Sequence, residues 1–409
     1  MGKRIFISMS PATRSLLANT AALGVVVVAL ILLTNTNLSR PAPLPSTETI
    51  ATTTSETASV AAVAETKSAP PSSPEKSAPV KKTTPPPPQK TETASSSPAS
   101  APETGTTTDS SVVRIQDPYP FPPQTFVQVN EETRAALVNI LCAPHSGSLR
   151  PISGSGVIID PRGVIITNAH VAQYVLLSQD PRVDLSCVIR TGAPAAPRWS
   201  VEVLYIPPVW VKEHAKDILA DHATGTGEHD YALLRVTGPA TQSSLPLPDR
   251  FPALPVDTRD AIGFLGDLAL VASYPAEFIG GIAAQFDLYP ASSVTPIQDL
   301  LTFHTKTVDL ISLGGIIEAQ SGSSGGAVVN AWGRLIGVIT TTSEGATTAE
   351  RDLRAITLSY INSDLAVQSG FDLAFILGGD IAAQAADFKA HEAPALNRLL
   401  IEQISKRSQ

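Results

Sequence analysis

A serine flanked by glycines is the first residue of this chain that could do chemistry. Ser324 lies in the segment Gln320–Ala327, which has the form Gly-x-Ser-Gly-Gly. Glycines beside a serine let the backbone turn sharply and keep side chains away from an incoming carbonyl group. The neighbouring N–H groups can then stabilise an oxyanion. Because glycine- and serine-rich runs are also ordinary loops, the segment gains meaning only if a base and an acid accompany it.

A candidate base and a candidate acid each stand at the end of a predicted strand. His170 closely follows the β-branched run Val164–Thr167, and of the seven histidines it alone directly follows a buried-strand pattern. Asp230 opens an apolar run, where a partly buried carboxylate can hold an imidazole in one tautomer and stabilise its positive form. Asp217 and Asp221 are rival acids, but neither precedes a strand-like run.

The order histidine, aspartate, serine resembles that of the trypsin-like serine proteases. The motifs Thr-Asn-Ala-His, Asp-x-Ala-Leu-Leu and Gly-x-Ser-Gly-Gly are closest to the bacterial Deg/HtrA-like branch, and the resemblance covers about residues 125–370. It implies an all-β fold of two six-stranded antiparallel β-barrels that hydrolyses peptide bonds in polypeptide substrates, with no cofactor and no metal. Short apolar runs that alternate with Gly, Pro and Asp turns over the same residues independently favour an all-β barrel or sandwich.

The resemblance assigns a role to each residue of the motifs. Ser324 is the nucleophile, His170 the general base and then the general acid, and Asp230 the residue that orients the histidine. The N–H groups of Gly322 and Ser324 form the oxyanion hole. A serine hydroxyl is a poor nucleophile near neutral pH, so it needs an adjacent base that both takes and returns a proton.

Substrate-binding residues follow from the same resemblance. Glu318, six residues before the nucleophile, stands where the floor of the primary pocket is often found, and a buried carboxylate there favours Arg or Lys substrates. The alternative is a solvent-facing loop glutamate, since Deg-like members commonly prefer small apolar side chains. Thr340, Thr341 and Thr342 are expected to line the edge that pairs with an extended peptide. Ser323 replaces the usual Asp or Asn, so no zymogen-type ion pair is expected.

The sequence separation of 60 residues from His170 to Asp230 is longer than in compact bacterial members. The surplus around Thr191–Glu228 is polar and predicts a long surface insertion. Three histidines lie in it or directly after it, and for them solvated side chains are favoured over a metal site: His214, His222 and His229.

The N-terminal third predicts a membrane anchor and a tether. An apolar stretch at 16–33 follows a basic segment at 1–15, which places the N-terminus in the cytoplasm and the rest outside, in the periplasm or at the cell surface. The rival is a cleaved signal peptide, which would release a secreted protein. Residues 34–120 are rich in Pro, Ser, Thr and Ala and predict a disordered linker. The protease domain is expected at 121–370 and a short helical extension, too short for a PDZ domain, at 371–409.

The two cysteines fit an extracytoplasmic location. In the fold that the resemblance implies, Cys142 and Cys187 lie on strands of the same barrel, and an extracytoplasmic chain with two cysteines is expected to pair them. The alternative is two buried free thiols.

A formal net charge of −8 argues against a nucleic-acid partner. No feature of the sequence predicts an oligomeric state. Two hypotheses from different classes result: a membrane-tethered serine endopeptidase, favoured by the complete set of motifs, and a catalytically inactive trypsin-like module that acts as a tethered binding protein.

Overall fold

The computed structural model describes residues 117–146, 149–220, 225–241, 246–260, 262–277, 286–303, 307–343 and 345–407. The expected anchor at 16–33 and all but the last residues of the expected linker at 34–120 lie outside these ranges. Within them, no helix combines the length and the apolar character needed to cross a bilayer.

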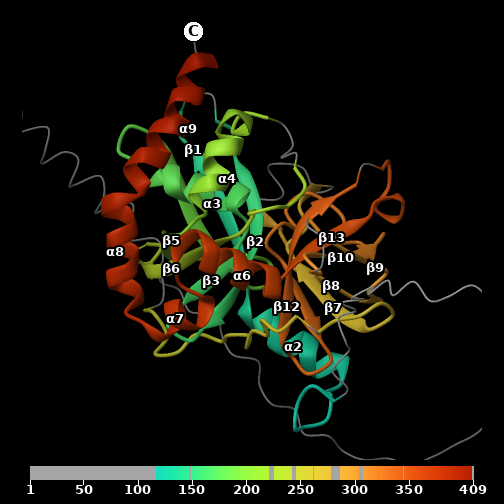
Figure 1. Ribbon diagram of the computed structural model, residues 1–409. Helices are drawn as coiled ribbons and strands as arrows, with labels where there is room; N and C mark the ends of the chain where they lie inside the picture. The colour runs from blue at the N-terminus through green and yellow to red at the C-terminus, as the bar shows by residue number, and fades with distance from the viewer. Residues whose placement is uncertain are drawn as a thin grey trace, which may run out of the picture. The chain divides into compact units, whose positions relative to one another are not determined.

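The first half of the described chain forms the predicted six-stranded antiparallel barrel (Figure 1). Its strands close in the order β1-β2-β3-β6-β5-β4. Their bounds are β1 Leu137–Pro144, β2 Ile152–Asp160, β3 Val164–Thr167, β4 Leu185–Thr191, β5 Ala196–Tyr205 and β6 Ala232–Pro239. The apolar run of β3 is buried along its whole length, and β6 pairs with it so that Thr167 lies opposite Ala232. The ends of β3 and β6 therefore bring the segments around His170 and Asp230 together.

The second half forms a curled seven-stranded sheet, so the prediction of a second six-stranded barrel is wrong. The strand order is β8-β7-β11-β12-β13-β10-β9. The bounds are β7 Leu268–Ser273, β8 Ala291–Pro296, β9 Asp299–Leu301, β10 Leu310–Gly314, β11 Ala327–Asn330, β12 Leu335–Thr342 and β13 Leu353–Thr357. β8 and β9 stand at opposite edges although only two residues separate them in the chain. Pro296, which has no N–H, ends β8, so the expected sixth strand is broken into two.

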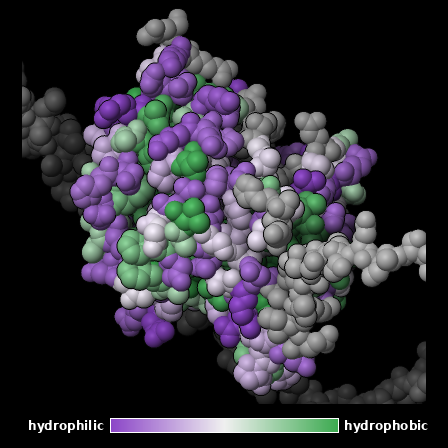
Figure 2. Space-filling view, viewed as in Figure 1, coloured by the Kyte–Doolittle hydropathy of each residue, from purple (hydrophilic) through white to green (hydrophobic). Residues whose placement is uncertain are grey.

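Helices pack against both sheets. Their bounds are α2 Phe126–Ala136, α3 Ala169–Ser178, α4 Pro208–His214, α6 Leu358–Ser369, α7 Leu373–Gly378, α8 Ile381–His391 and α9 Ala393–Arg407, with short 3₁₀ turns η2 Ala215–Asp217 and η4 Thr348–Glu350. The prediction of short C-terminal helices is confirmed: α8 packs on β5, and α9 packs on α3 and α4 (Figure 1). Figure 2 shows hydrophilic and hydrophobic residues interspersed over the face of the protein that is seen in Figure 1.

The segment Thr191–Glu228 is not the long surface insertion that its polar composition predicts. It contributes β5 to the barrel, and its helix α4 contacts α9. Trp210 is 5% exposed and Val211 is fully buried, so apolar side chains anchor this segment. Residues 221–224, which include His222 and Asp221, lie outside the described ranges.

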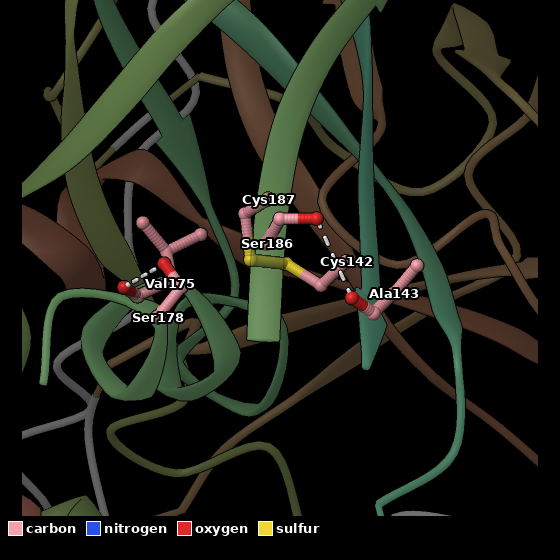
Figure 3. The surroundings of a disulfide bond; sticks show 6 residues. All are labelled: Cys142, Ala143, Val175, Ser178, Ser186 and Cys187. Carbon is pink, nitrogen blue, oxygen red and sulfur yellow. Dashed lines mark hydrogen bonds between the residues drawn. A yellow bond between two sulfur atoms is a disulfide. The ribbon is translucent and has the colours of Figure 1, made fainter. Parts of the chain in front are cut away.

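A disulfide joins Cys142 of β1 to Cys187 of β4 (Figure 3). The two residues are direct partners in the antiparallel register, with their Cα atoms 4.0 Å apart. The bond therefore links two neighbouring strands of the barrel and closes a loop across a sequence separation of 45 residues.

Candidate active site

His170 and Asp230 are hydrogen bonded to each other in a nearly buried pair. Asp230 lies just before β6, and its Oδ2 is 2.8 Å from Nδ1 of His170. Its Oδ1 accepts a second hydrogen bond, at 3.0 Å, from the backbone N–H of His170, the second residue of α3. Asn168, which precedes that helix, donates from Nδ2 to the Asp230 carbonyl oxygen at 2.8 Å. The imidazole is therefore held by its Nδ1 side, which leaves Nε2 free to accept a proton.

Asp230 is 5% exposed, yet its environment favours the carboxylate form. Burial by itself raises the pKa of this carboxyl group, but the attraction of His170 and the hydrogen bonds from His170 and Thr340 outweigh burial and hold the pKa below its usual value. An ionised carboxylate beside the imidazole can stabilise the imidazolium that forms when Nε2 takes a proton.

Thr340 has a contact that the sequence interpretation missed. Its Oγ1 donates to Oδ2 of Asp230 at 2.8 Å, and the residue is 5% exposed. Its side chain thus faces the acid in the interior. The residues that follow it, Thr341 and Thr342, pair with β13 opposite Arg354 and Leu353.

The side of β12 away from β13 loses its strand partner at this point. β11 pairs with β12 only as far as Val338, and Ile339 then exchanges backbone hydrogen bonds with Gly325 and Gly326. Among the described residues no strand continues this side along Thr340–Thr342. An extended peptide could add there by backbone hydrogen bonds.

The glycines around Ser324 occupy positions where a side chain would clash with neighbouring atoms. Gly322 has a φ of 93°, and the N–H of Ser323 donates to the carbonyl of Gln320 at 3.2 Å, which forms a tight turn. A Cβ on Gly325, whose φ is 87°, would lie 2.0 Å from the carbonyl oxygen of Ser155.

The same Cβ would lie 2.4 Å from Oγ1 of Thr167, the last residue of β3. The turn that carries Ser324 therefore rests against the strand end that leads to His170. The Ser324 hydroxyl makes no hydrogen bond to His170 within the described ranges, and catalytic hydrogen bonds are often long before substrate binds.

The N–H groups of Gly322 and Ser324 take no part in the hydrogen bonds of the turn among the described residues. Neither donates to any residue that the structure describes, whereas the N–H groups of Ser323, Gly325 and Gly326 all donate to backbone carbonyls. Two N–H groups on one turn that have no acceptor among the described residues could donate together to an oxyanion.

Glu318 is fully buried, so the alternative of a solvent-facing loop glutamate is wrong. The hydroxyl of Ser293 lies 3.0 Å and 2.9 Å from its two carboxylate oxygens. Burial raises the pKa of Glu318, and the hydrogen bond from Ser293 opposes this only in part. No cationic side chain in the described part of the chain forms an ion pair with this carboxylate.

Two other histidines in or beside this segment, His214 and His229, each contact a carboxylate. His214 contacts Asp217 at 3.3 Å and stacks on Trp210, so Asp217 is occupied away from His170. Nδ1 of His229 contacts Asp364 of α6 at 2.9 Å. The described ranges contain no group of three or more His, Cys, Asp or Glu residues that could hold a metal ion.

Comparison with known proteins supports the family that these motifs indicate. Residues 154–338 match the family model of the trypsin-like peptidase domain. A search of curated proteins found no match for the chain.

Proposed function

Because residues 154–338 match the family model of the trypsin-like peptidase domain, we propose that this protein is a serine endopeptidase whose triad is Ser324, His170 and Asp230. The observation that carries the proposal is the hydrogen-bonded His170–Asp230 pair, which leaves the other imidazole nitrogen free, together with a serine turn that packs against the strand end leading to His170. This arrangement provides a base, its orienting acid, a nucleophile and two N–H donors, which is the set that acyl transfer requires.

In the proposed mechanism, the Ser324 Oγ attacks the scissile carbonyl carbon while Nε2 of His170 takes the hydroxyl proton. The N–H groups of Gly322 and Ser324 donate to the oxyanion of the tetrahedral intermediate. As the carbon–nitrogen bond breaks, His170 returns the proton to the leaving amine, and an acyl-enzyme remains on Ser324. Water then attacks this ester with the same base, which releases the acid product and restores the serine.

The free side of β12 would hold the substrate as an added antiparallel strand. Glu318 would set the preference of the primary pocket. A buried carboxylate without a cationic partner is unfavourable, so a substrate with Arg or Lys before the cleaved bond would supply the missing cation.

The proposed location is outside the cytoplasm, tethered by residues 16–33. The apolar stretch and its basic flank support an anchor, and the Cys142–Cys187 disulfide supports an oxidising compartment. Alkaline carbonate extraction of membranes tests the anchor. The protein should stay in the pellet, whereas release into the supernatant, or a mature N-terminus after residue 33, would favour the cleaved signal peptide.

Labelling of the full-length chain in detergent with a fluorophosphonate probe tests the enzyme hypothesis. The wild type and Ser321→Ala should react, because Ser321 is an exposed serine of the same turn, and Ser324→Ala should not. Failure of the folded wild type to react with the probe and to cleave any member of a peptide library would favour the inactive binding module.

A further inference from the structure

One buried hydroxyl of the barrel holds the turn that carries the N–H donors. Ser155 lies in the middle of β2 and is fully buried. Its Oγ accepts a hydrogen bond from the N–H of Tyr274 at 2.9 Å and donates to the carbonyl of Gly322 at 2.7 Å. The hydroxyl thus bridges the end of β7 and the turn, and both of its hydrogen-bonding functions are used.

The backbone of Ser155 holds the same turn a second time. Its N–H donates to the carbonyl of Ser324 at 2.7 Å. Its own carbonyl accepts from Oγ1 of Thr167 at 2.7 Å and lies where a Cβ on residue 325 would be. One residue of β2 therefore fixes the carbonyls of Gly322 and Ser324, the two residues whose N–H groups are unused.

The carbonyl of the Gly322–Ser323 peptide is held by a side chain, whereas the carbonyls of the two adjacent peptides are held by backbone N–H groups. The carbonyl of Ser321 accepts from the backbone N–H of Ala276 at 2.8 Å, and that of Ser323 from Gly326 at 2.9 Å. Only the carbonyl between them is held by a side chain, and it belongs to a glycine, which has the widest choice of backbone conformations.

A hydrogen bond between two hydroxyl groups holds the next residue of the turn, Ser323. Ser273, the last residue of β7, donates from Oγ to Oγ of Ser323 at 2.9 Å, and Ser323 is 1% exposed. The side-chain contacts to Gly322 and Ser323 are thus neutral hydroxyls, in the place where an ion pair is expected in relatives that need zymogen cleavage.

We propose that Ser155 is a positioning residue of the oxyanion hole: its hydroxyl fixes the Gly322–Ser323 peptide, which lies between the two donor peptides, and so restricts the backbone torsions that orient the Gly322 and Ser324 N–H groups. The inference rests on the proposed serine-protease function and extends it to a residue of the other sheet. Loss of a whole oxyanion donor costs about 10²–10³ in rate, so loosening donors that remain should cost about tenfold or more in kcat.

The test compares Ser155→Ala with Thr133→Ala on the full-length chain, using a peptide substrate that the wild type cleaves. Thr133 is a matched control, because it is equally buried and its hydroxyl donates at 2.7 Å to a carbonyl within α2, away from the turn. In Ser155→Ala, kcat should fall about tenfold or more with KM within about threefold of wild type, since the lost stabilisation belongs to the transition state. Thr133→Ala should keep the wild-type kcat.

A kcat within twofold of wild type in folded Ser155→Ala would overturn the inference. If Ser155→Ala does not fold, Ser155→Cys takes its place, because its thiol keeps a weak donor. It should show a smaller loss of kcat, and a wild-type kcat in this variant would again overturn the inference.

Amide hydrogen exchange over residues 320–326 tests the positioning role of Ser155 independently of the proposed protease function. If the wild type cleaves nothing, the proposed function fails, but the positioning claim still predicts faster exchange in this segment for Ser155→Ala and unchanged exchange for Thr133→Ala. Equal exchange in the segment for wild type and Ser155→Ala would overturn the positioning role, whatever the activity.

Discussion

Replacing Thr340 by valine removes one hydrogen bond from the acid of the proposed triad while it nearly preserves side-chain shape. In the wild type the Thr340 hydroxyl donates to Oδ2 of Asp230 at 2.8 Å, beside the bond from Nδ1 of His170 to the same oxygen. Because the carboxylate is buried, water cannot replace the lost donor.

A hydrogen bond to a charged group contributes about 1.5–3 kcal/mol to stability. Taking about 2 kcal/mol, Thr340→Val should lower the melting temperature by roughly 4–8 °C. The same hydrogen bond is expected to stabilise the transition state, in which His170 is an imidazolium. If its loss raises the activation free energy by about 1.4 kcal/mol, kcat/KM should fall about tenfold, mainly through kcat.

The assay is steady-state hydrolysis of a peptide substrate together with thermal unfolding followed by circular dichroism. Thr295→Val is the control, since Thr295 is another buried threonine of the same sheet and its hydroxyl donates to the carbonyl of Leu313. This variant should keep its full activity. If Thr340 instead served substrate binding, as the sequence alone indicated, KM would rise and kcat would stay unchanged. That result, or wild-type kinetics in the folded variant, would refute the reasoning.

Three further perturbations test other parts of the structure. Cys142→Ser with Cys187→Ser should lower the free energy of unfolding by about 4 kcal/mol in the chain-entropy model, and two titratable thiols in the folded, non-reduced wild type would contradict the disulfide. The pKa of His229 is raised in the folded protein, mainly by its hydrogen bond to Asp364. The pair therefore stabilises the fold fully at a pH below the histidine's unfolded-state pKa of about 6.5, and this stabilisation is lost as the pH rises through its folded-state pKa. His229→Asn, which tolerates the φ of 58°, should therefore lose more stability at pH 5.5 than at pH 8.5 in urea unfolding, and an equal loss at both would refute the pair. Glu318→Gln should abolish a preference for Arg or Lys in a cleavage profile, and a wild-type profile without that preference removes the specificity proposal.

Local patterns were sufficient to predict the elements that carry the base and the acid. The buried run of β3 ends before His170, and the apolar run of β6 begins after Asp230. Because β3 and β6 are neighbours in the barrel, residues at these two ends meet, as the order of motifs suggested.

Contacts between distant segments could not be predicted in the same way. The alternation of a strand indicates which face a residue occupies, but it does not identify a partner. Thr340 lies 110 residues from Asp230, and Ser155 lies 167 residues from Gly322. Their roles depend on how the two sheets are joined, which no local window of sequence contains.

Two errors about the fold have local causes that composition obscured. Pro296 divides one expected strand into β8 and β9, because it ends β8 without offering an N–H. The segment Thr191–Glu228 contains many polar residues, but a few buried side chains, Trp210 and Val211 among them, anchor it. Average polarity therefore predicted a surface loop where a strand and a helix form.

The central claim, that Ser324 is the reacting residue, is tested most directly by locating the adduct of a fluorophosphonate probe. The labelled full-length protein is digested, and tandem mass spectrometry identifies the modified residue. A single adduct on Ser324, lost in His170→Ala, is the predicted result. An adduct on Ser321 or Ser323, or labelling of Ser324 that persists without His170, would contradict the proposed triad.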